Sequence, residues 1–232
     1  MNRQVIKNRT RKILAYTFTS IAFLVISAFL ILQIPSVQKN IIDRYLANFS
    51  QVTGFTATVK NFRLLWFDRL ELEDLSVIDP SNNEMIAAKR VVINFTLGQL
   101  LEKQDVNVDG VFLENASVLF TKIPESDTSR DLNINIFIHR INERYASQSA
   151  EGGRTPRINI GEAVLQQSQF SYVDQYRDSI DTGFNYNQFT FDIDEGQLQN
   201  FLILGDTTQF QVNTLIATDR QSKLAIRERS TF

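Results

Sequence analysis

The chain has 232 residues, of which 43% are hydrophobic and 22% are charged, and its formal net charge is −2. It contains no cysteine and one histidine, so disulfides, iron–sulfur clusters, cysteine-ligated zinc and a catalytic thiol are excluded, and a catalytic triad would have to be built around His139. We find no acidic or basic tail of the kind that binds nucleic acid and no phosphate-binding motif, so we expect no nucleic-acid partner, no cofactor, no metal and no enzymatic activity.

The N-terminus combines a basic cluster with a long uncharged segment. Five basic residues occur in the first twelve, and residues 13–32 contain no charge. Twenty residues at ~1.5 Å each span the ~30 Å hydrocarbon core of a bilayer. A cleaved signal peptide is the alternative, but the apolar run is long and no A-x-A follows it. We therefore predict a cytoplasmic segment at 1–12 and a transmembrane anchor at 13–34. Its apolar residues include Ile13, Phe18, Phe23, Leu24, Val25, Phe29 and Leu32.

The anchor is followed by a helical pattern. Pro35 and Ser36 provide a helix start signal, and apolar residues then recur at spacings of four and three. This stripe consists of Val37, Ile41, Tyr45, Phe49 and Val52. Gly54 is well placed to end the helix. The pattern predicts an amphipathic helix at 35–54, just outside the bilayer.

From Phe55 onward the apolar period changes to two, which predicts a mainly β region over 55–232. Alternating segments lie at 55–59, 70–72, 91–95, 170–172, 184–186, 189–193 and 210–212. We predict turns at 79–83 and 147–155, and short helices at 97–102 and 134–145. The acidic clusters at 68–74 and 192–195 fit the solvated faces of strands.

Two stretches of the β region resemble each other. Residues 106–120 read VNVDGVFLENASVLF and residues 158–172 read INIGEAVLQQSQFSY, with a partial third copy at 70–77. In each copy the alternation slips by one residue at a polar pair, which is 73–74, 114–115 or 166–167. Such a slip indicates a two-residue turn or a β-bulge, and the sequence favours neither. The similarity indicates a recurring β unit, with chance resemblance between alternating strands as the alternative.

The order of these elements resembles a known family. The helix IPSVQKNIIDRYLANFSQVTG and the units FDRLELEDLSVIDPSNNEMIAAKRVVINF, VDGVFLENASVLFTK and LNINIFI follow a basic N-terminus and one span. Together they resemble the N-terminal region of AsmA-like proteins, and in particular TamB-type inner-membrane subunits of the translocation and assembly module. The resemblance covers nearly the whole chain, and it rests on the order of elements rather than on one sharp motif.

The resemblance implies an architecture and a function. It implies a curved antiparallel sheet, groove-like or taco-like, with a few short helices. The protein would be a single-pass protein of the bacterial inner membrane, with its bulk in the periplasm. It would serve phospholipid transport to the outer membrane, protein assembly there, or both. Its partners would be the inner membrane, phospholipid and an Omp85-type outer-membrane assembly protein. Because family members are usually longer, we expect this chain to be truncated at its C-terminus. The part that contacts the Omp85-type assembly protein would then be absent.

The one-sided strands permit two interpretations. In the first, their apolar side chains line an open groove, with Phe55, Val59, Leu72, Ile93, Val108 and Phe191 as predicted lining residues. In the second, the same faces form a closed core covered by the helices. The chain would then be an anchored periplasmic module that binds another envelope protein.

Overall fold

The computed structural model describes residues 16–24, 26–27, 30–31, 33–65, 68–96, 98, 106–125, 129–148, 157–180, 183–204, 207–222 and 224–229. The chain divides into residues 1–41 and residues 42–232. In the first unit, residues 16–24 are helical. Among the described residues, no helix is both long enough and apolar enough to cross a membrane. The predicted cytoplasmic segment and part of the predicted anchor, including Ile13, Val25, Phe29 and Leu32, lie outside the described residues.

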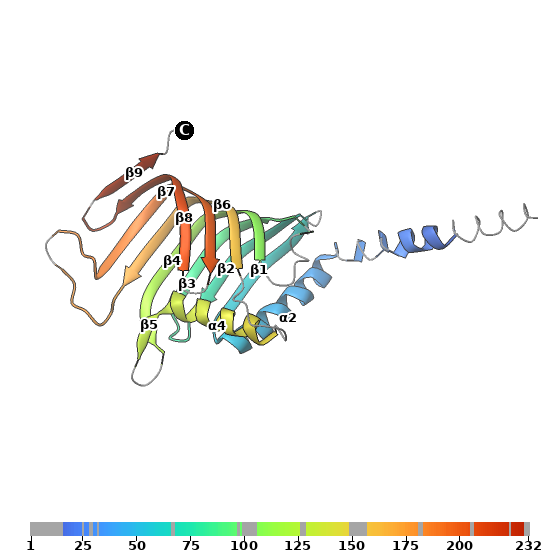
Figure 1. The fold of residues 1–232 in the computed structure, drawn as a ribbon, viewed down its shortest axis with the longest axis horizontal. Coiled ribbons are helices and arrows are strands. Elements are labelled where there is room, and N and C mark those ends of the chain that lie inside the picture. Colours follow the sequence, from blue (N-terminus) through green and yellow to red (C-terminus); the bar gives the residue numbers. More distant parts are fainter. Residues whose placement is uncertain are drawn as a thin grey trace, which may run out of the picture. The chain divides into compact units, whose positions relative to one another are not determined.

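The second unit is dominated by one curved, unclosed sheet, as Figure 1 shows. Its strands are β1 (Thr56–Leu65), β2 (Arg69–Ile78), β3 (Glu84–Asn94), β4 (Val106–Pro124), β5 (Arg130–Leu132), β6 (Arg157–Val173), β7 (Gln188–Leu204), β8 (Thr207–Asp219) and β9 (Ala225–Arg229). Their order is β1-β2-β3-β4-β6-β7-β8-β9, and β5 pairs with β4 outside this path. The predicted mainly β region with a curved sheet is therefore confirmed.

One pair of strands corrects the prediction of a purely antiparallel sheet. Strands β4 and β6 are parallel, whereas the other neighbouring strands are antiparallel. Between them the chain forms β5 and the helix α4 (Asn133–Gln148). A crossover helix lets the next strand start at the same end of the sheet, which a short hairpin cannot do. This helix confirms the one predicted at 134–145.

The slips in alternation are neither turns nor β-bulges with one extra residue. Strands β2, β4 and β6 continue through them, with φ of 50° at Asp74, 49° at Asn115 and 47° at Gln167. The register is the same on both sides of each slip, because the neighbouring strand slips at the same level. At each slip one residue has no partner in the register of the neighbouring strand. We call the row of these residues the slip line; it consists of Lys60, Asp74, Lys89, Asn115, Gln167 and Asp194.

Apolar side chains stay on one face of the sheet because all these strands slip together. In β2, for example, Leu72 before the slip line and Leu75 after it both pack in the core, while Asp74 is exposed. A second, shorter row crosses β4, β6 and β7 at Asp109, Gly161 and Asn200. A Cβ on Gly161 would lie 2.6 Å from the carbonyl oxygen of Asp109, so this crossing requires glycine.

Two helices cover part of the sheet on the face that we call the inner face. The helix α2 (Pro35–Thr53) contributes Leu46 and Phe49, and α4 contributes Ile136 and Phe137. The ring of Phe137 lies 5.1 Å from that of Phe55 and 5.9 Å from that of Phe49, between centroids. The first core cluster consists of Phe55, Ala57, Val77, Met85, Ile123 and Ile136, and the second of Val59, Leu72, Ala88, Val91 and Ala116.

The end of α2 confirms its predicted C-terminal cap. Gly54 has φ of +70°, and its N–H donates to the carbonyl of Ser50 at 2.9 Å. Arg140 of α4 donates from Nη1 to the carbonyl oxygen of Thr53 at 2.5 Å. The guanidinium therefore satisfies one of the last carbonyls of α2 and ties the two helices together.

The predicted apolar stripe of α2 is wrong in detail. Tyr45 is 75% exposed and Val52 is 43% exposed, whereas Phe49 packs in the core as predicted and is joined there by Leu46, which the predicted stripe did not include. The helix carries apolar residues on more than one side, and the sheet can cover only one of them. Periodicity alone therefore identified one of the two packed residues, Phe49, and missed Leu46.

Other local predictions had mixed outcomes. The turn at 79–83 is confirmed, because Asp79 Oδ1 accepts hydrogen bonds from the N–H groups of Ser81 and Asn83. The strand predicted at 184–186 is wrong; residues 183–187 belong to the connection between β6 and β7 and form no strand. Asn185 is buried there, and its Oδ1 accepts from the N–H groups of Asn187 and Gln188. The helix predicted at 97–102 and the turn at 147–155 lie mainly outside the described residues.

Candidate functional site on the inner face of the sheet

The inner face is covered by helices over β1 to β3. Phe55 is 0% exposed, and Val59 and Leu72 are each 9% exposed. Ile93 is partly buried against the second core cluster, to which Val59 and Leu72 belong. These four of the six predicted lining residues therefore belong to a packed core or its margin. In the structure these four side chains pack in or beside the core, and their role as lining residues of a lipid groove stays a prediction.

The inner face is different over β4, β6, β7 and β8, which we call the open inner face. Its apolar side chains are mostly half-buried rather than fully buried, and Val108 and Phe191 are among them. The others include Val111, Leu113, Ile160, Leu165, Phe170, Ile193, Leu198, Phe201, Val212 and Leu215. In the described part of the chain, α4 packs against β4 and β5 but leaves the strands beyond largely uncovered. A row of half-exposed apolar side chains thus crosses four strands.

Aromatic rings are concentrated at one end of the open inner face. Phe120 and Phe170 contact edge to face at 5.1 Å, and Tyr172 stacks on Phe189 at 5.4 Å, between centroids. The other contacts connect Phe170, Phe184, Phe189 and Phe191. Phe184 comes from the loop after β6, and sequence analysis missed its role because it assigned this residue to a strand.

The opposite face of the sheet is polar. Across β7 and the turn after β8, Arg220 lies 2.8 Å from the carboxylate of Asp192, and this hydrogen bond raises the pKa of the guanidinium. On β1 to β3, Glu71 and Glu73 pair with arginines, as expected for solvated strand faces. Gln197 donates to Glu162 at 2.5 Å across β6 and β7. The sheet therefore separates an apolar surface from a charged one.

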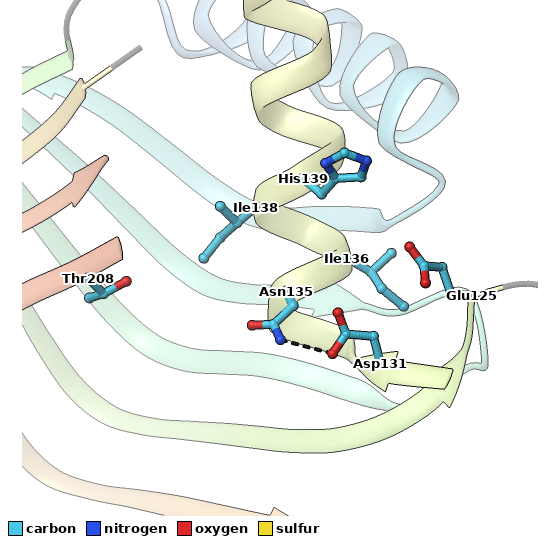
Figure 2. Close-up of a pocket in the computed structure, with 7 residues that line it drawn as sticks. All are labelled: Glu125, Asp131, Asn135, Ile136, Ile138, His139 and Thr208. Atoms are coloured by element: carbon cyan, nitrogen blue, oxygen red, sulfur yellow. Dashed lines mark hydrogen bonds between the residues drawn. The ribbon is translucent and has the colours of Figure 1, made fainter. Parts of the chain in front are cut away.

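A cavity of about 350 Å³ lies between α4 and the start of β8. Figure 2 shows its lining residues, which are Glu125, Asp131, Asn135, Ile136, Ile138, His139 and Thr208. Asn135 donates from Nδ2 to Asp131 Oδ1 at 2.9 Å. The cavity combines carboxylates with two isoleucines, and sequence analysis did not anticipate it. Only Thr208 lay near a predicted strand, and no pattern connected it with residues 125–139.

The side chain of His139 is 62% exposed, and its Nε2 lies 3.4 Å from Glu143 Oε1 one turn further along α4. No group of three or more His, Cys, Asp or Glu side chains in the described segments could hold a metal ion. The candidate site therefore consists of an apolar face of the sheet, a polar face opposite to it, and a cavity with two carboxylates beside the apolar face.

These features define an open, curved β-sheet protein with one partly uncovered apolar face and two helices that close one part of it. No model of a known protein family matches the sequence, and no curated protein matches it. The resemblance to AsmA-like proteins therefore remains a prediction from the sequence.

Proposed function

We propose that this chain is an AsmA/TamB-type protein, anchored in the inner membrane by residues 13–34, whose open inner face conducts phospholipids through the periplasm. The observation that carries the proposal is the row of half-exposed apolar side chains across β4, β6, β7 and β8. A contiguous apolar surface that is not fully covered is a feature of sites where another apolar molecule binds. The destination would be the outer membrane, where the lipid path would support membrane biogenesis and protein assembly.

The energetics favour such a surface. Exposing an acyl chain to water costs ~0.8 kcal/mol per CH₂ group, so a lipid with about 30 such groups faces a barrier on the order of 20 kcal/mol. A sheet that contacts one side of each chain removes a large part of this cost. The side chains required are apolar and half-exposed, which is the state of Val108, Leu198 and Phe201.

The helices α2 and α4 give the covered part of the sheet a different role in this proposal. They pack on Phe55 and Val59, so lipid would not pass beneath them. The covered core supports one end of the sheet, and the open inner face beyond it carries the lipid.

A second function has its own support. The deep burial of Phe55, Val59 and Leu72 fits a protein-binding module with a closed core. In that case a partner protein, rather than lipid, would cover the open inner face. An Omp85-type assembly protein or another envelope protein would be the partner.

Photocrosslinking separates the two functions. A photoreactive amino acid would replace Val108 or Phe191 on the open inner face of the full chain in membranes. Matched controls are Asn107 and Thr190, the preceding residues, whose side chains point to the other face. Phe55 is a third control, because it is covered. We expect phospholipid adducts at 108 and 191 and none at the controls. Protein adducts alone at 108 and 191 would contradict lipid conduction and favour the second function.

A further inference from the structure

The cavity between α4 and β8 lies at the border between the helix-covered and the open parts of the inner face. From α4 it receives Asn135, Ile138 and His139 (Figure 2). Ile136 lines the cavity as well and also belongs to the first core cluster. From the other side it receives Thr208, whose strand partner in β7 is Ile203. The cavity is therefore positioned to hold the end of a molecule that lies along the open inner face.

The cavity carries negative charge without a cation to balance it. Asp131 Oδ1 accepts from Asn135 and from the N–H of Leu132, and Glu125 Oε2 accepts from Ser129 at 3.1 Å. All these donors are neutral, and neither carboxylate forms an ion pair within the described residues. Among the described residues that line the cavity there is no lysine or arginine. By contrast, the carboxylate of Asp174 in the following loop lies 2.7 Å from Lys122 Nζ.

An apolar surface continues from the cavity along β8. Phe210 follows Thr208 by two residues, so both side chains project from the same face about 7 Å apart. The ring of Phe210 stacks on that of Phe201 in β7 at 5.8 Å between centroids, and Phe210 is 52% exposed. A ligand with its charged end in the cavity would thus place its next segment on these two rings.

We propose that this cavity is a binding site for the ammonium headgroup of an amphiphile, that is, for an amine-bearing phospholipid. Glu125 and Asp131 accept hydrogen bonds from the ammonium, which has three donors, and Ile138 contacts its methylene groups. The acyl part lies on Phe210 and Phe201, so this part of the inference rests on the proposed function. Two uncompensated carboxylates repel a headgroup whose only charge is a phosphate. The cavity therefore selects among lipids that the apolar face alone would accept equally.

The test compares two lipids that differ in the headgroup. The full chain in a neutral detergent would be titrated with short-chain phosphatidylethanolamine and with short-chain phosphatidylglycerol, and bound lipid would be counted by native mass spectrometry. We expect about tenfold tighter binding of the ethanolamine lipid, which corresponds to ~1.4 kcal/mol. The double variant Glu125→Gln/Asp131→Asn should reduce the preference to less than about twofold by weakening the ethanolamine lipid. Asp131→Asn keeps the Oδ1 acceptor, so the hydrogen bonds from Asn135 and from the N–H of Leu132 should remain.

A matched double variant controls for overall charge. Asp194→Asn/Glu195→Gln removes the same charge from two exposed positions outside the cavity and should leave the preference unchanged. The variant Phe210→Ser should weaken both lipids to a similar degree. Phosphoethanolamine, which has the same headgroup but no acyl chains, tests whether the site binds a whole lipid or a small soluble amine. We expect it to compete only weakly with the ethanolamine lipid.

The possible outcomes separate the two proposals. Equal binding of both lipids, unaffected by the cavity variant but weakened by Phe210→Ser, would overturn the headgroup site and leave lipid conduction standing. Competition by phosphoethanolamine as strong as that by the whole lipid would show a site for small soluble amines and overturn the amphiphile assignment. Absence of binding by either lipid would contradict both proposals.

Discussion

Leu113 of β4 and Leu165 of β6 are direct neighbours in the parallel part of the sheet, and they are also corresponding residues of the two similar sequence stretches. The same offset holds from Val106, which pairs with Ile158, to Thr121, which pairs with Val173. The similarity in sequence therefore coincides with spatial pairing. In a parallel register, equivalent residues face the same surroundings, so similar side chains fit at both positions.

The slip line predicts an unusual response to substitution at Gln167, where φ is 47°. A side chain in the left-handed region costs ~1–2 kcal/mol, and a β-branched one costs most. We expect Gln167→Ile to reduce the free energy of unfolding by about 2 kcal/mol. Gln167→Asn should be neutral or slightly stabilising, because asparagine tolerates this conformation. Urea unfolding of the two variants would measure the difference.

Gln199 provides the control for the slip line. It lies in β7 without a left-handed φ, so Gln199→Ile should change stability by less than about 0.5 kcal/mol. Equal costs at 167 and 199 would contradict the special backbone conformation of the slip line.

Gly54 should not tolerate a side chain. Its φ is +70°, and an added Cβ would lie 2.6 Å from Arg140 Nη1. We expect Gly54→Ala to cost ~2 kcal/mol in unfolding free energy, through the left-handed backbone and the displaced arginine. In an Arg140→Ala background the same substitution should cost only ~1 kcal/mol, because the steric part is gone. Thermal or urea unfolding of the four proteins completes the cycle. Gly98→Ala serves as a control, because no described residue lies within 4 Å of the position that its Cβ would take.

Asn133 should be the polar residue whose loss destabilises the fold most. It is 0% exposed. Its Nδ2 donates to the carbonyl oxygen of Leu119 at 3.0 Å and to Asp79 Oδ2 at 3.2 Å. Its Oδ1 accepts from the N–H of Thr121. Asn133→Leu removes all three hydrogen bonds from a buried site, although Asp79 Oδ2 still accepts from Asn83 Nδ2, and this loss should cost about 3 kcal/mol. The measurement is the midpoint of urea unfolding. Exposed Asn135, replaced in the same way, should shift stability by less than about 0.5 kcal/mol, and a similar loss at both would refute the buried network.

The ion pair between Asp174 and Lys122 predicts a pH-dependent contribution to stability. The hydrogen bond from Lys122 lowers the pKa of the Asp174 carboxyl, with help from the N–H of Tyr176 and against the effect of burial. A carboxyl with a depressed pKa stabilises the fold above its ordinary pKa of about 3.9, and this contribution disappears as pH falls through the folded value. The deficit of Lys122→Gln should therefore be constant above about pH 5 and shrink in acid.

Urea unfolding between pH 3 and 7 would measure this deficit. Lys60→Gln is the control, because its ion pair with Asp74 is exposed on both sides and contributes little. A deficit for Lys122→Gln that remains constant into acid would show that the carboxylate is not what the lysine stabilises.

Two leucines test whether the inner face is open. Leu72 lies in the core at 9% exposure, whereas Leu198 of β7 is only half-buried. Leu72→Ala should cost about 3 kcal/mol, and Leu198→Ala about 1 kcal/mol, because less apolar contact is lost at a surface that water already reaches. Urea denaturation of both variants gives the comparison. Equal costs would favour the closed core of the second function.

Much of this architecture follows from the sequence. Alternation located most strands, Gly54 marked the end of α2, and the polar pairs at 73–74, 114–115 and 166–167 marked the slip line. These features are local, because each depends on the period of side chains along one strand or helix. Periodicity does not report strand direction, which is why the parallel pairing of β4 and β6 was missed.

The site depends more on long-range geometry. Alternation identified Val108 and Phe191 as inner-face residues, but it could not show that helices cover Phe55 and Val59 while leaving the other two half-exposed. The cavity joins Asp131 with Thr208, which are far apart in the chain and belong to no shared pattern. Only the curvature of the sheet and the position of α4 bring them together.

The slip line also limits how this sheet can change in evolution. Deleting one residue from β4 near Asn115 would turn every later side chain of that strand to the opposite face, while its neighbours kept theirs. The apolar side chain of Phe120 would then point to the charged surface. Insertions and deletions should therefore be confined to the connections between strands, and a change in the position of the slip line would have to occur in adjacent strands together.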